Sequence, residues 1–302
     1  MTEPASGRRQ ALWVLLILVV LPLIWGYNWI VIKQVQRYIG PFEFGAFRYI
    51  VGSLILFAII KAMKRPLAIQ HWGQIILVGL FQIAINTALT IWAVRGGPAG
   101  RSAVLNYAMP IWVVVMAWPA LGERPSRPQW IALATAFPGI ICLFASRGTQ
   151  GRNQAAVLAL LSGIAWAIGS ILAKRLMTKH RMDPLVLTAW QMFVAGIAMA
   201  LAAFAFPGKP TQWSQPYLIF SLIWEVLPAT ALAWFLWTLL LKKVDAGVAG
   251  LAVLSAPVVG ILAGALELRE VPLPLEALGM LLILIGLLFV GPLAIRQVRQ
   301  RT

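Results

Sequence analysis

The chain has 302 residues, of which 61% are hydrophobic and 11% charged, and its formal net charge is +16. Soluble domains are about half apolar and about a quarter charged, so this composition excludes an ordinary water-soluble protein and indicates a lipid environment. The positive charges occur in short clusters between apolar runs, not as one basic surface, which argues against nucleic acid as a partner.

Apolar runs separated by charge, glycine and proline clusters cover most of the chain. A helix needs about 20 apolar residues to cross a bilayer, and barrel strands would instead alternate apolar and polar residues. The first run is too long for the core of a signal peptide, so it is expected to be a span. The predicted spans are 11–33, 42–61, 72–94, 99–121, 128–146, 154–174, 184–206, 217–241, 246–266 and 273–295.

Lys and Arg residues favour one side of the predicted membrane. With the N-terminus inside, sixteen of the 25 lie in inside segments, eight lie in outside loops, and Arg48 lies within a span. Cytoplasmic loops carry the excess of positive charge in membrane proteins. We therefore predict that both termini are cytoplasmic.

Polar and aromatic residues recur at helical spacing inside the spans. In the third span Gln82 and Asn86 lie four residues apart, on one helix face, and in the sixth span Ser170 follows Trp166 by four. Unsatisfied polar groups in hydrocarbon cost several kcal/mol, so these faces should point into the protein. We predict a polar cavity for the substrate, walled by Trp25, Asn28, Gln82, Asn86, Asn106, Tyr107, Trp166, Ser170 and Trp237.

Trp25 and Trp166 lie a dozen or more residues inside their spans, whereas interfacial tryptophans lie near span ends. Rigid indole rings at that depth can wall a cavity and stack on an aromatic or sulfur-containing substrate. Core packing is the alternative for these rings. For the polar residues the alternative is interhelical hydrogen bonding, worth about 0.6 kcal/mol per bond.

Arg48 and Glu225 are charged residues within predicted spans. A charge at the bilayer centre costs about 3 kcal/mol on insertion scales, so a functional role is the default interpretation. Both lie within nine residues of the outer ends of their spans, where that cost is lower. Two interpretations stay open, in which Glu225 carries a proton during transport or the residues form a charge pair.

Pro110 and Pro257 occupy the middle of the fourth and ninth predicted spans. Proline removes a helical hydrogen bond and kinks the chain. We therefore predict that both prolines are hinges.

The two halves of the chain can be laid over each other. Trp25 matches Trp166 at a shift of 141 residues, and Pro110, Glu123, Pro125 and Gly139 match Pro257, Glu270, Pro272 and Gly286 at 147. Because each half has five spans, an odd number, the second half must cross the membrane in the opposite orientation. The predicted fold is an all-α membrane protein of ten transmembrane helices in two inverted five-helix repeats, residues 1–147 and 148–302.

Several motifs resemble those of the drug/metabolite transporter superfamily. They are Trp-Gly-Tyr-Asn-Trp at 25–29, Pro-Ala-Gly-x-x-Ala at 98–103, and a Glu-x-Pro turn at Glu123 and Glu270 before the fifth span of each half. Each half resembles an EamA domain, and within the superfamily the chain is most similar to bacterial aromatic amino acid exporters. The resemblance implies a multi-pass transporter of the bacterial inner membrane. The oligomeric state stays open: a monomer is favoured, and dimerisation through the GxxxG step of Gly260 and Gly264 is the alternative.

The resemblance and the predicted cavity together favour export of amino acids, aromatic and other apolar or small neutral ones such as methionine and threonine, by alternating access. The alternative is a multidrug or metabolite exporter of cationic or amphipathic compounds. An exporter of cationic compounds is expected to have a carboxylate deep in the first span, where this chain has Asn28 as its polar residue. A channel is a further alternative.

Residues that commonly hold metals or cofactors are scarce. The sequence has one cysteine, Cys142, and two histidines, His71 and His180, both in predicted loops. It has no HExxH motif. We expect no metal and no cofactor. An intramembrane enzyme would need paired acids or a nucleophile–base pair, and the nine acidic residues, mostly in loops, do not supply one.

Overall fold

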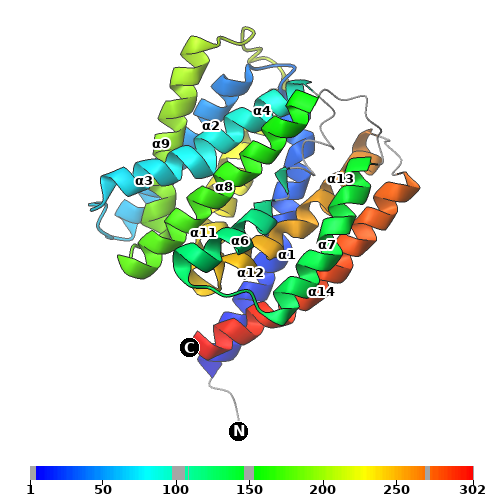
Figure 1. Cartoon of the computed structure of the whole chain (residues 1–302). Coiled ribbons are helices and arrows are strands. Elements are labelled where there is room, and N and C mark those ends of the chain that lie inside the picture. Colours follow the sequence, from blue (N-terminus) through cyan, green and yellow to red (C-terminus); the bar gives the residue numbers. More distant parts are fainter. Residues whose placement is uncertain (1–4, 97–105, 108, 146–152, 269–272, 302) are drawn as a thin grey trace.

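The structure is a computed structural model that describes residues 5–96, 106–107, 109–145, 153–268 and 273–301. All regular elements in these residues are helices (Figure 1). They are α1 (Ala5–Val35), α2 (Pro41–Ala62), α3 (Trp72–Val78), η1 (Gly79–Ile85), α4 (Asn86–Gly96), α6 (Met109–Leu121), α7 (Arg127–Ala145), α8 (Asn153–Lys179), α9 (Pro184–Ala205), α10 (Pro216–Trp224), η2 (Glu225–Leu232), α11 (Ala233–Lys243), α12 (Ala246–Ala252), η3 (Val253–Ser255), α13 (Ala256–Leu268) and α14 (Pro274–Arg301).

Within the described residues, seven helices are long and apolar enough to cross a membrane, and Met109–Leu121 and Ala277–Gly286 are shorter apolar helices. An all-helical membrane protein is therefore confirmed. The predicted spans 99–121 and 128–146 and the repeat boundary at residue 147 include residues outside the described part. That the chain has ten transmembrane helices stays a prediction.

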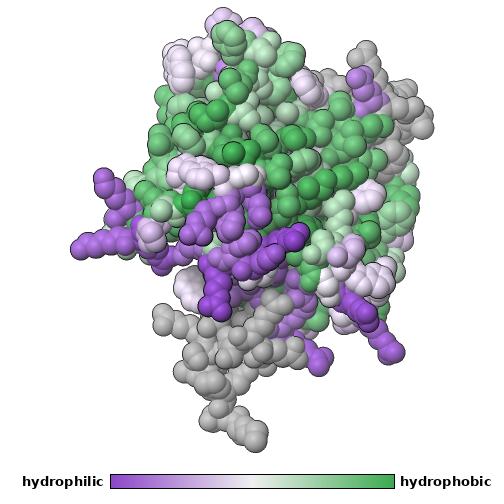
Figure 2. Space-filling model, turned by 60° about the vertical axis from the view of Figure 1, so that its left-hand side comes forward, coloured by the Kyte–Doolittle hydropathy of each residue, from purple (hydrophilic) through white to green (hydrophobic). Residues whose placement is uncertain are grey.

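The outer surface is apolar over much of its height. Large side chains such as Phe204 and Leu266 are 90% and 86% exposed, and Figure 2 shows a broad hydrophobic surface with hydrophilic side chains gathered toward one end. Such a surface would be unstable in water and matches the hydrocarbon of a bilayer.

The ends of the chain define the two faces of the molecule. Figure 1 shows the beginning of α1 beside the end of α14, whereas α8 begins at the opposite end of the molecule. We call the end with the beginning of α1 the terminal face and the opposite end the far face. The first helices of the two halves thus run in opposite directions.

Local sequence signals explain where matched helices begin. Pro41 and Pro184 occupy the first positions of α2 and α9, where the missing N–H of proline has no helical partner to lose. Asp183 caps α9 by accepting hydrogen bonds from the backbone N–H groups of Leu185 and Val186. These two equivalent helices pack against each other along their length.

Helices that line the centre of the molecule are interrupted at equivalent positions. η1 and η2 are π-helical segments, and residues 79–85 shifted by 147 fall within 225–232. α6 begins at Met109 and α13 at Ala256, at the same shift. Interruptions of this kind leave backbone groups that must be satisfied inside the protein, away from lipid.

Pro110 and Pro257 lie at the beginnings of the helices that form the second parts of their predicted spans. Each is the second residue of a helix, α6 or α13. Proline in the first turn of an α-helix loses no α-helical hydrogen bond. A hinge at these breaks stays a prediction.

α7 and α14, which end the two halves, approach each other at backbone distance. A Cβ atom built on Gly139 would lie 2.8 Å from the carbonyl oxygen of Gly279, and one built on Gly286 would lie 3.0 Å from that of Ala132. Both glycines, and both carbonyls, are related by the shift of 147. Small residues permit this close helix packing in membranes.

Gly139→Ala should therefore destabilise the protein, because its methyl group would press on a backbone carbonyl that cannot turn away. We expect a loss of about 1–3 kcal/mol, seen as a lower thermal unfolding midpoint in detergent. Gly73→Ala is the matched control, since a Cβ atom there meets nothing within 4 Å. Equal midpoints for the two variants would contradict the close packing of α7 on α14.

Candidate functional site

A cavity of about 120 Å³ lies between helices of both halves. One water molecule needs roughly 10–15 Å³, so the space is large enough for a solute rather than a single water. Its wall follows α1 from Trp25 to Gln36 and also includes Pro41 at the beginning of α2. Because α1 runs from the terminal face to the far face, the cavity extends toward the far face.

Six of the nine predicted site residues line this cavity. They are Trp25, Asn28, Asn86, Asn106, Tyr107 and Trp166. The other three are buried beside it. Gln82 donates a hydrogen bond from Nε2 to Ser170 Oγ at 2.9 Å, and Trp237 packs against Trp166 with ring centroids 4.3 Å apart. Their role in substrate binding stays a prediction.

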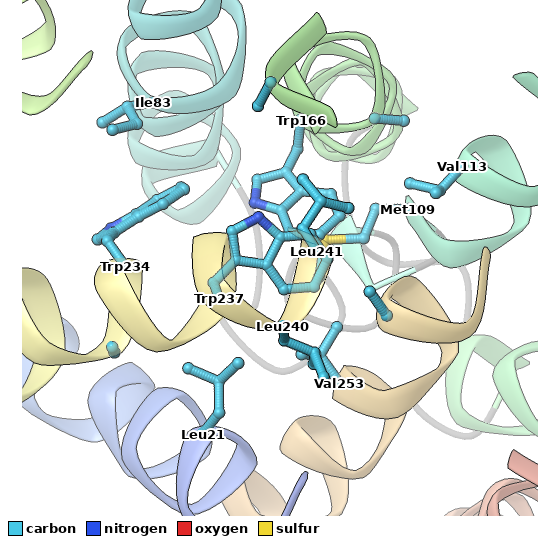
Figure 3. Close-up of a cluster of buried hydrophobic side chains, with 14 of the residues drawn as sticks. Leu21, Ile83, Met109, Val113, Trp166, Trp234, Trp237, Leu240, Leu241 and Val253 are labelled. Atoms are coloured by element: carbon cyan, nitrogen blue, oxygen red, sulfur yellow. The ribbon is translucent and has the colours of Figure 1, made fainter. Parts of the chain in front are cut away.

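Indole rings close the cavity on the side of the terminal face. Trp25 meets Trp234 edge-on at 5.5 Å and lies 6.1 Å from Trp237. Figure 3 shows Trp166, Trp234 and Trp237 among buried aliphatic side chains, with Leu240 and Leu241 following on the same helix as Trp237. Trp237 is fully buried behind the wall formed by Trp25, Trp166 and Trp234.

Amides and hydroxyls form a connected neutral network on another part of the wall. Asn106 Nδ2 donates to Ser162 Oγ at 2.5 Å and to Thr90 Oγ1 at 3.3 Å. Asn86 Nδ2 donates to the carbonyl oxygen of Ser162 at 2.9 Å. These bonds use the amide nitrogens, and in each residue the amide oxygen still has capacity to accept.

Arg48 and Glu225 come together as a buried ion pair. Arg48 Nη1 lies 2.6 Å from Glu225 Oε2, and their side chains are 9% and 0% exposed. Arg48 lines the cavity, whereas Glu225 lies behind it. The geometry is that of a charge pair, and proton transfer through Glu225 stays a prediction.

Sequence reasoning missed several residues of the wall. Tyr49 and Thr87 line the cavity and are joined by a hydrogen bond of 2.9 Å between their hydroxyl groups. Thr87 follows Asn86 directly and precedes Thr90 by three residues, on the polar side of the third predicted span. The signal that could have found Tyr49 is its position next to Arg48.

A second missed feature is a buried lysine near the terminal face. Lys174 of α8 is 1% exposed. Its Nζ donates to the carbonyl oxygen of Leu241 at 2.6 Å and to that of Val244, and lies 3.7 Å from Glu123 Oε1. Glu123 in turn accepts from the N–H of Ala246 at 2.6 Å. Lys174 thus ties α8 to the end of α11, and Glu123 extends the contact to the beginning of α12.

A helical membrane protein with an internal cavity that is closed toward one face has the architecture of a solute transporter. The sequence model of the EamA-like transporter family matches residues 12–145 and, a second time, residues 153–291. The chain belongs to this family, within the drug/metabolite transporter superfamily, so the predicted resemblance is confirmed. Residues 98–103 and Glu270, which contributed to that resemblance, lie outside the described residues.

Curated relatives extend over most of the chain. The uncharacterized transporter YoaV of Bacillus subtilis is 26% identical over 281 residues, covering 91% of this chain and 95% of its own. A probable amino-acid metabolite efflux pump of Escherichia coli is 27% identical over 292 residues, covering 93% and 94%. A solved crystal structure superposes with a TM-score of 0.77 at 19% identity, covering 94% of this chain and 98% of that one.

Replacing Lys174 should weaken the closure near the terminal face. Lys174→Met keeps the length of the side chain but leaves buried carbonyl oxygens without their donor, at a cost of about 1–3 kcal/mol per group. We expect a lower thermal unfolding midpoint than in Lys179→Met, the control, because Lys179 ends the same helix and is exposed. An unchanged midpoint for Lys174→Met would show that these bonds do not stabilise the closed arrangement.

Proposed function

We propose that the chain is a secondary transporter that exports amino acids, aromatic and other apolar or small neutral ones such as methionine and threonine, by alternating access. The observation that carries this proposal is a cavity walled by Trp25 and Trp166, one from each repeat, together with neutral amides and hydroxyls. Indole faces suit aromatic and sulfur-containing side chains. The name of the Escherichia coli relative, an amino-acid metabolite efflux pump, supports the same class of solute.

The proposed architecture is ten transmembrane helices in two inverted repeats, residues 1–147 and 148–302, with both termini in the cytoplasm. It is supported by the opposite directions of α1 and α8 (Figure 1) and by the equivalent interruptions at η1 and η2. The lysine and arginine distribution supports the orientation. The terminal face is then cytoplasmic, and the cavity extends toward the outside.

The alternative of a cationic-drug exporter is less favoured. Such a site needs a carboxylate that the substrate can reach. Glu225 is 0% exposed and does not line the cavity, and the charge that does line it is the cation Arg48. The wall therefore offers a cationic substrate no carboxylate partner, and its one charged group, although paired with Glu225, is itself a cation.

The direct test is uptake of radiolabelled amino acids into proteoliposomes that contain the purified protein. Phenylalanine, methionine and threonine should be taken up, and a cationic dye should neither enter nor compete. We propose facilitated transport, because Glu225 is sequestered behind Arg48, so uptake should follow the substrate gradient alone. Accumulation that collapses with a protonophore would contradict the facilitator mechanism, and absence of amino acid uptake would contradict the function.

Trp166→Ala should impair aromatic substrates more than threonine. Loss of stacking and apolar contact should cost about 1–3 kcal/mol for phenylalanine, or roughly tenfold to a hundredfold in affinity. Trp72→Ala is a matched control, because Trp72 begins α3 and lies outside the cavity wall. Competition assays with unlabelled phenylalanine or threonine against labelled phenylalanine measure the two affinities in each variant. An equal loss for phenylalanine and threonine would indicate a general structural defect rather than a substrate contact.

A further inference from the structure

Arg48 is the one charged side chain in the cavity wall, as far as the described residues define that wall. It lies on α2, one turn beyond Gly45, and the neutral network of Asn86 and Asn106 lines the same space. A solute in the cavity therefore meets one cation and otherwise neutral groups.

The guanidinium group of Arg48 has more hydrogen-bond donors than its protein partners accept. Arginine carries five N–H donors in a planar fork. Nη1 donates to Glu225 Oε2 at 2.6 Å and Nη2 donates to Tyr49 Oη at 2.7 Å. Nε is itself buried and has no hydrogen-bond partner in the part of the chain that the structure describes. More donors are therefore present than the protein uses.

The orientation of the guanidinium group is fixed before any solute binds. Its Cζ lies 4.5 Å from the centre of the Tyr49 ring, and the Tyr49 hydroxyl is itself held by Thr87 at 2.9 Å. Glu225 accepts from the other terminal nitrogen, Nη1. A donor that is held in place in this way loses little side-chain entropy when an acceptor arrives.

Stability alone is a weak reason for this ion pair. Buried ion pairs can often be replaced by packed apolar residues without loss, because desolvation offsets the attraction between the charges. Charged residues inside membrane spans instead mark substrate or ion pathways. The pair is also asymmetric, since the cation lines the cavity and the anion does not.

We propose that Arg48 binds the carboxylate of the substrate and that the site selects compounds with this group over the corresponding amines. The inference rests on the proposed transport of amino acids and assigns its specificity to one residue. Arginine matches the planar geometry of a carboxylate. Because Glu225 balances the charge of Arg48, the site as a whole is neutral, which suits a zwitterion more than an anion of higher charge.

The first arm of the test compares ligands on the wild-type protein. Isothermal titration in detergent measures the Kd of phenylalanine, of phenethylamine, which lacks the carboxylate, and of 3-phenylpropionate, which lacks the amine. We expect phenylalanine to bind about 10- to 100-fold more tightly than phenethylamine, the range for a hydrogen bond to a charged group. We expect 3-phenylpropionate to bind more tightly than phenethylamine as well.

The second arm assigns this preference to Arg48. In the Arg48→Gln/Glu225→Gln double variant no charge is left unpaired, and the preference for phenylalanine over phenethylamine should disappear. Arg65→Gln/Asp183→Asn is the matched control, because that ion pair of 2.9 Å lies outside the cavity with side chains 43% and 39% exposed. The control should keep the full preference. If the double variant does not fold, Arg48→Lys, which keeps the charge but lacks the fork, should reduce the preference.

The outcomes separate the inference from the proposed function. Equal binding of phenylalanine and phenethylamine to the wild type, with both bound, overturns the role of Arg48 and leaves amino acid transport standing. A preference that survives in a folded Arg48 variant also overturns that role. If no amino acid binds the wild type, the proposed function fails and the inference fails with it.

Discussion

Hydrocarbon offers no hydrogen-bond partners, and this constraint governs where the chain can depart from a regular helix. The π-helical segments η1 and η2 and the breaks that precede Pro110 and Pro257 leave backbone groups that lipid cannot satisfy. All four interruptions belong to helices or segments that contribute to the cavity or pack beside it. The irregular backbone is therefore gathered in the interior, where polar side chains are also placed, and the outer surface stays apolar.

The same constraint explains the two different ways in which charge is buried. Arg48 and Glu225 compensate each other within the membrane region, whereas Lys174 is compensated mainly by carbonyl oxygens at the end of α11 and by Glu123. The first arrangement faces the cavity and the second lies near the terminal face. The indole layer of Trp166 and Trp237 and the contacts of Lys174 lie on the side of the terminal face, whereas the cavity wall extends toward the far face.

The sequence was most informative where the physical signal is a length or a repeat. Apolar runs predicted most helices to within a few residues, as for α2 and α9. Helical spacing predicted that Asn86 and Trp166 face one cavity, and both line it. Burial of Lys174 was not predictable, because a lysine at a span end normally reaches water, and its partners are backbone carbonyls that no residue type signals. Tyr49 and Thr87 were missed because their pairing depends on the packing of separate helices.

The central claim is that the cavity is reached from one face at a time. A cysteine at Thr90, in the cavity wall, can be placed in a Cys142→Ala background and labelled in proteoliposomes with an impermeant maleimide from each face separately. In the protein that retains Lys174, the cysteine at position 90 should be labelled faster from the far face than from the terminal face. Adding Lys174→Met should raise the rate from the terminal face and lower the rate from the far face, because the two open states compete. A rise at the terminal face with no fall at the far face would indicate a continuous channel and contradict alternating access.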